Sequence, residues 1–163
     1  MGCQVSNNRH FTRTLLMIAA LALYFSQANA ATEISPGVLY QPGTRLQVSS
    51  LGLELTVPKN WQALLPQGSE ALVMEPIGQT ARMIVTAVPD SSAQSIRQLM
   101  SQAQALDAMT QLLPSGQLNE SNGIFSQQFQ VSGHNPQNLK ASAYGRLGSN
   151  RIALFVVMLE PAG

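Results

Sequence analysis

Side chains that could do acid–base chemistry are few in this chain of 163 residues. A hydrolase that uses a catalytic triad needs a base, usually histidine, that a carboxylate orients. Beyond the N-terminal segment the chain has one histidine, His134, within the sequence Ser132-Gly133-His134-Asn135-Pro136. The glycine and proline around it predict a surface loop, and no carboxylate lies near it in the sequence. We therefore expect His134 to be structural or incidental.

Carboxylates can also act in pairs, as in glycoside cleavage. Glu70 and Glu75 lie near one expected strand, whereas Asp107 and Glu120 lie elsewhere in the chain. A chain with eight carboxylates offers such pairs by chance, so their presence alone carries little weight. The sequence favours a protein that is not an enzyme, and an unrecognised enzyme is the alternative.

Sequence motifs for metals, nucleotides and cofactors are missing as well. The chain has no HExxH motif and no Cys/His cluster that could ligate zinc. It has no GxGxxG, GxxxxGK[ST] or GxSxG motif, and no SxxK with its supporting set. A Met and Leu stripe within residues 96–109 has helical spacing, which predicts core packing. We expect neither a metal nor a cofactor.

The N-terminal segment has the three-part layout of a secretory signal. Basic residues precede an apolar core at Thr14–Phe25, and Ala28 and Ala30 place small side chains where a signal peptidase reads them. We predict a signal peptide over residues 1–30 that is cleaved before Ala31. The alternative is an uncleaved anchor, which the short apolar run disfavours because spanning a bilayer takes about 20 apolar residues.

Cleavage would leave 133 of the 163 residues, enough for one domain with its own core. Seven Lys/Arg and eight Asp/Glu remain, which is a net charge of −1. A nearly neutral surface does not gather phosphates, so we expect no nucleic-acid partner, and contact with a membrane only through the signal peptide before cleavage. The single cysteine, Cys3, lies within the signal, so the mature domain is cysteine-free. We expect a periplasmic or secreted protein that binds a partner in the bacterial cell envelope.

A strand, a turn and the only tryptophan follow each other in the first half of the mature chain. Residues 51–57 alternate apolar and polar side chains, which predicts a strand with one apolar face. Pro58 ends this strand because proline has no N–H for the ladder. Trp61 is then expected to fold back and cover the end of the sheet, and a ligand platform is the alternative interpretation.

A hairpin and a helix are expected next. The apolar runs 71–75 and 82–88 predict two paired strands. Ser91 with Gln94 fits a capping box, so a helix should begin near Ser92. Its end is open, because Asp107 or the sequence that follows it can stop the helix early. The apolar face of this helix would comprise Ile96, Leu99, Met100, Ala103, Leu106 and Met109.

Three strands complete the expected order of elements. They cover residues 123–131, 139–147 and 151–159, and the last is apolar on both faces, as a central strand would be. Residues 31–50 read as an irregular entry segment with short edge strands, ahead of a single domain at 51–163. Strands, one helix and more strands predict an α+β fold with a mostly antiparallel sheet and the helix on one face.

The stretch GLELTVPKNW at Gly52–Trp61, the ALVMEP run at Ala71–Pro76 and the strand at Arg82–Val88 resemble PsbP/Mog1-like domains of small exported bacterial proteins. The matching region spans about a third of the mature chain. The resemblance implies an antiparallel sheet between helices and a non-catalytic binding or accessory role. It supplies no site residues. Such domains usually carry a closing helix, whereas this sequence reaches Gly163 directly after a strand, so a bare sheet face that carries a small molecule or lipid is the alternative function.

Overall fold

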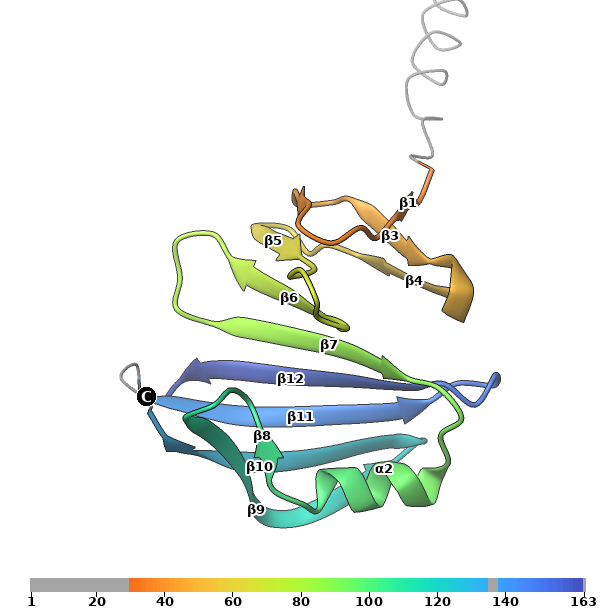
Figure 1. Cartoon of the computed structure of the whole chain (residues 1–163). Helices are drawn as coiled ribbons and strands as arrows, with labels where there is room; N and C mark the ends of the chain where they lie inside the picture. The colour runs from red at the N-terminus through yellow and green to blue at the C-terminus, as the bar shows by residue number, and fades with distance from the viewer. Residues whose placement is uncertain (1–29, 135–137, 163) are drawn as a thin grey trace, which may run out of the picture. The chain divides into compact units, whose positions relative to one another are not determined.

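The central element of the fold is a sheet of nine strands whose neighbours are all antiparallel (Figure 1). The computed structural model describes residues 30–134 and 138–162. Most of the expected signal peptide, including Ala28, lies outside the described residues, as do Asn135 and Pro136. In spatial order the strands are β2 (Leu39–Tyr40), β5 (Trp61–Leu64), β6 (Ala71–Pro76), β7 (Arg82–Val88), β12 (Ala153–Pro161), β11 (Leu139–Leu147), β10 (Ile124–Gly133), β9 (Thr110–Ser121) and β8 (Gln104–Ala105).

A second, smaller sheet has the order β1-β3-β4. Strand β1 (Thr32–Glu33) runs parallel to β3 (Arg45–Val48), which pairs antiparallel with β4 (Leu53–Thr56). The expected short strands of the entry segment are therefore present, but β3 is the middle strand of its sheet and not an edge. The expected strand at 51–57 is shorter than predicted. A 3₁₀ helix at Ser49–Leu51 and Gly52 at φ 63° turn the chain before β4 begins.

The helix α2 (Ala93–Met100) begins where the sequence predicts, with Ser92 as its N-cap. The predicted capping box is wrong by one residue. The backbone N–H of Ser95 donates to Ser92 Oγ at 3.1 Å, and the N–H of Ser92 donates to Ser95 Oγ at 2.7 Å. Ser91 instead is buried, and its hydroxyl donates to the Val88 carbonyl at 2.9 Å.

The apolar face predicted for this helix, which includes residues up to Met109, extends past the end of the helix. The chain leaves the helix after Met100 and pairs Gln104 and Ala105 with the start of β9. Asp107 Oδ1 then accepts the N–H of Met109 at 2.8 Å, which forms a turn in place of a further helical turn. Met109 is 69% exposed, so it contributes little to the core. Tertiary strand pairing has here overridden a helical pattern of apolar residues.

The nine-stranded sheet is covered on both faces, but over different strands (Figure 1). On one face α2 packs against β9, β10 and β11. On the other face the smaller sheet packs against the half made of β2, β5, β6 and β7. The first cluster comprises Ile96, Met100, Leu112, Phe125, Phe129, Ala141, Ala143, Ala153 and Leu159. The second cluster comprises Tyr40, Leu46, Val57, Ala63, Leu72, Met74 and Val85.

Strand β12 lies in the middle of the order, which confirms the prediction from its apolar faces. Phe155 and Val157 pack against the first cluster, whereas Leu154 and Val156 pack against the second. The strand therefore needs apolar side chains at successive positions. The α+β class, the mostly antiparallel sheet and the helix on one face are confirmed.

Candidate functional site

An uncovered apolar surface remains on the face that carries α2, over the half of the sheet that the helix does not reach. The register places Val73 of β6 opposite Ile84 of β7, and Ile84 opposite Val157 of β12, so the three side chains share this face. Leu64 of β5 continues the row because it pairs with Val73, and Leu39 of β2 pairs with Leu64. The opposite face of these strands packs against the second cluster, so both of their faces carry apolar side chains.

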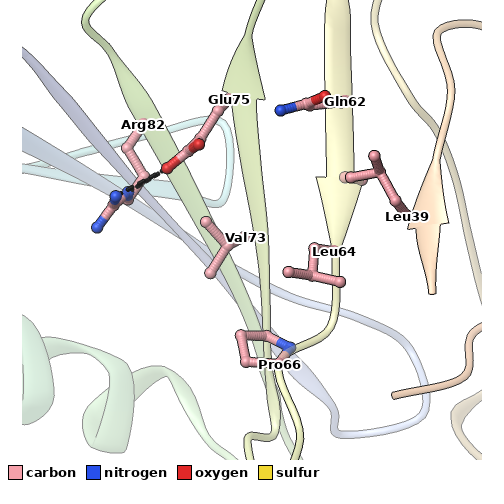
Figure 2. A pocket seen from close by; sticks show the side chains of 8 residues that line it. Leu39, Gln62, Leu64, Pro66, Val73, Glu75 and Arg82 are labelled. Carbon is pink, nitrogen blue, oxygen red and sulfur yellow. Dashed lines mark hydrogen bonds and ion pairs between the residues drawn. The ribbon is translucent and has the colours of Figure 1, made fainter. Parts of the chain in front are cut away.

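Two adjoining hollows lie along this surface, and we call them together the apolar groove. The larger, of about 460 Å³, runs over β6, β7 and β12 beside α2 and β8. The smaller, of about 260 Å³, lies over β2, β5 and β6 (Figure 2). Val73 and Arg82 line both hollows. Figure 2 shows Leu64, Pro66 and Val73 gathered at one end of the smaller hollow. Leu39 is 50% exposed, so the apolar row reaches the edge of the sheet uncovered.

An ion pair lies at one end of the apolar groove. Arg82 Nη2 lies 2.7 Å from Glu75 Oε1, and Arg82 Nε donates to the same oxygen at 2.8 Å (Figure 2). Both side chains are about half exposed, so this pair adds little to stability. The position of the ion pair is relevant to ligand binding, because Arg82 lines both hollows of the groove and also the pocket beyond them.

This further pocket, of about 420 Å³, is polar and lies between the β6–β7 turn, the β8–β9 loop and the end of β10. Asp107, Thr110 and His134 line it together with the Glu75–Arg82 pair. The N–H of Met109 lowers the pKa of Asp107 below its ordinary value, and Thr110 and the charge of His134 add to the effect. Asp107 is therefore a carboxylate at neutral pH. We call this hollow the polar pocket.

The backbone of His134 is held at the end of β10, and its structural or incidental role stays a prediction. Its backbone N–H donates to the Met109 carbonyl at 3.1 Å, and the buried Thr110 hydroxyl donates to the His134 carbonyl at 3.1 Å. Asp107 shares the polar pocket with it. Sequence reasoning missed this grouping, because the pairing of Gly133 with Thr110, which brings the β8–β9 loop to the end of β10, joins residues far apart in the sequence.

The four carboxylates singled out in the sequence have different surroundings. Glu70 is exposed ahead of β6, and Glu120 is held by Arg97, whose Nη2 lies 2.6 Å from Glu120 Oε2. Glu75 and Asp107 do line one pocket. A glycosidase acid needs a raised pKa, whereas that of Asp107 is lowered. The pocket is thus better suited to hold a charged or hydrogen-bonding group than to donate a proton.

The remaining predicted site residues lie away from the groove. Trp61 opens β5 and packs, half-buried, against the second cluster, while its neighbour Gln62 lines the groove. Its role as a ligand platform stays a prediction. Ala30 is exposed and Ala31 half-buried, ahead of β1.

Two kinds of feature are missing from residues 30–134 and 138–162. Within these ranges no three His, Cys, Asp or Glu side chains are grouped so that they could hold a metal ion. In the same part of the chain no helix has both the length and the hydropathy of a membrane span.

Comparisons of the chain with protein-family models, curated proteins and solved structures found no match. The resemblance to PsbP/Mog1-like domains therefore stays a prediction. The groove and the pocket are the structural features that bear on function.

Proposed function

We propose that this chain is an exported, non-catalytic binding protein of the bacterial cell envelope, and that it carries an apolar small molecule in the apolar groove. One observation carries the proposal: a row of apolar side chains crosses five adjacent strands on the face that carries α2 and extends beyond the strands that the helix packs against. Apolar surface of this kind marks binding sites in soluble proteins.

The dimensions of the apolar groove support a small molecule. Binding sites for drug-sized ligands enclose roughly 300–1,000 Å³ and are mostly apolar with a few polar groups. The larger hollow, of about 460 Å³, lies within that range, and α2 and β8 form a wall along one side of it. The side chains of Ile84, Phe155 and Val157 form its floor, with Thr86 among the few polar groups. The lowered pKa of Asp107 in the polar pocket supports a non-catalytic role, because it makes this carboxyl group a poor proton donor.

Titration with Nile red, a neutral dye that fluoresces in apolar surroundings, tests this proposal. The wild-type protein should bind the dye, and Ile84→Glu should abolish binding because it places a charge on the groove floor. Ile84→Trp should also weaken binding by filling the space, without burying a charge. Tyr144→Glu is the control, since Tyr144 is 43% exposed and lies on the opposite face of β11 from Ala143 and Gly145. Failure of the wild type to bind, with native mass spectra that show only the bare chain, would contradict the proposal.

Export is tested separately, through the N-terminus. We expect the mass of the protein recovered from outside the cytoplasm to correspond to a chain that begins at or near Ala31. Recovery of the intact chain from Met1, extracted only by detergent, would oppose cleavage.

A partner protein of the cell envelope is the second candidate for the ligand. Ile77 is 56% exposed on the β6–β7 turn and Met109 69% exposed on the β8–β9 loop. These two segments border the polar pocket, and exposed apolar side chains on neighbouring loops are typical of protein contacts. A partner that is lost in the double variant Ile77→Ser, Met109→Ser but retained by Ile84→Glu would favour this candidate over the carrier.

A further inference from the structure

We propose that the molecule held in the apolar groove is an amphiphile, with its apolar chain along the sheet and a cationic head group in the polar pocket. This inference rests on the proposed carrier function and names the chemical class of its ligand.

Continuity between the two hollows is the first argument. The larger hollow of the groove and the polar pocket share Arg82, Leu106 and Asp107, so they adjoin beneath the segment that leads from α2 into β9. The shared boundary changes in character from one side to the other. Val73 and Ile84 line the groove side, whereas Thr110 and His134 line the pocket side. A ligand that occupied both would need an apolar part and a polar part in series.

The charges of the polar pocket indicate the sign of the head group. The ionisable side chains that line it are Glu75, Arg82, Asp107 and His134. The charges of Glu75 and Arg82 oppose each other within a 2.7 Å ion pair. This pairing leaves the carboxylate of Asp107, which is exposed at the boundary with the groove. A cationic head group complements it, while an anionic one would be repelled.

Displacement of Nile red by three amphiphiles with the same chain tests the inference: dodecylamine and dodecanoate, each below its micelle concentration, and dodecanol below its solubility limit. At low salt we expect dodecylamine to displace the dye at a concentration about two- to fivefold lower than dodecanoate, the range for an exposed charge pair. Asp107→Asn should bring this ratio close to one, because the amide retains an acceptor for the Met109 N–H but loses the charge. Concentrated salt should have the same effect on the wild type.

Two further variants make the result decisive. Asp90→Asn changes the net charge of the chain equally, but Asp90 lies beyond the opposite end of β7 from Arg82, so it should leave the ratio unchanged. Asp107→Lys should reverse the preference in favour of dodecanoate. Equal displacement by all three amphiphiles, or a ratio that Asp107→Asn does not alter, would overturn the cationic head group while leaving the carrier function intact. Absence of dye binding to the wild type would instead remove the carrier function.

Discussion

A Cβ atom placed on Gly145 of β11 would lie 3.0 Å from the Cγ2 atom of Ile96 in α2. It would also lie 3.1 Å from Met100 Sδ and 3.2 Å from Phe155 Cε1. The helix thus sits on the sheet at the one residue of β11 that has no side chain. Ile96 is fully buried there, so the first cluster depends on this close approach.

Gly145→Val should therefore destabilise the protein. Overpacking a well-packed core costs roughly 1–3 kcal/mol, and urea unfolding would measure the loss. Arg146→Val is the matched control, because the neighbouring residue of β11 is exposed and receives the same side chain without meeting the helix. An equal stability for both variants would contradict the tight contact with α2.

Gly133 at the end of β10 allows a still closer contact. Its φ is +92°, and an added Cβ would lie 2.1 Å from the Met109 carbonyl oxygen. Gly116 has φ +79° with nothing within 4 Å of the same position. We expect Gly116→Ala to lose roughly 1–2 kcal/mol from backbone strain alone. Gly133→Ala should lose clearly more, because the β8–β9 loop must also move. Chemical denaturation of both variants checks this order, and equal losses would oppose it.

The capping geometry of α2 predicts a contrast between two neighbouring positions. Ser92→Ala removes the acceptor for the Ser95 N–H, and loss of an N-cap costs about 1 kcal/mol. Gln94→Ala should leave the free energy of unfolding almost unchanged, since Gln94 is exposed and stands outside the box. Urea titrations of the two variants measure the difference. A larger loss for Gln94→Ala would instead favour the box at Ser91 and Gln94.

Glu33 links β1 to the 3₁₀ helix through hydrogen bonds and should make the free energy of unfolding depend on pH. The hydroxyl of Ser49 and then its backbone N–H donate to the carboxylate, and both lower the pKa of Glu33. A lowered pKa in the folded state gives stability that is complete above the ordinary glutamate pKa and is lost as the pH falls through the folded value. Glu33→Gln should therefore lose stability at about pH 7 and less at about pH 3.

Free energies of unfolding at the two pH values test this difference. The exposed Glu70 supplies the control, as Glu70→Gln should not reproduce the change. An unchanged gap between wild type and Glu33→Gln at both pH values would contradict the role of Ser49.

Alternation along the strands made most of the sheet predictable. Strand β11 has the predicted bounds, with Ala141, Ala143 and Gly145 buried and Tyr144 exposed, because a strand with one covered face has a period of two. Strand β9 was missed. Its Leu112-Leu113-Pro114 sequence resembles the end of a helix, and a proline is tolerated there because only the first residues of β9 pair with β8, which leaves Pro114 at an open edge.

Gln127 shows a limit of the same pattern. It occupies a buried position of β10, 3% exposed, on the face of Phe125 and Phe129, where burial favours an apolar side chain. Its Nε2 donates to the Ser115 carbonyl at 3.0 Å, where the register between β10 and β9 shifts. A bulge creates this polar partner, and no local sequence signal reports a bulge in the opposite strand.

The candidate site was predictable only in outline. The apolar faces of residues 71–75 and 82–88 were evident, but a groove exists only because α2 ends at Met100 and covers one half of the sheet. The polar pocket depends on strand order, which places Arg82 near Asp107 and His134 although none of them is close to another in the sequence.

Strands β7 and β12 contribute to both clusters, each through alternate residues. A chain truncated before Ala153 would lack β12 and would therefore lose buried side chains from two hydrophobic interiors at once. We therefore expect neither half of the protein to fold independently. Binding assays need the whole chain and not a fragment of it.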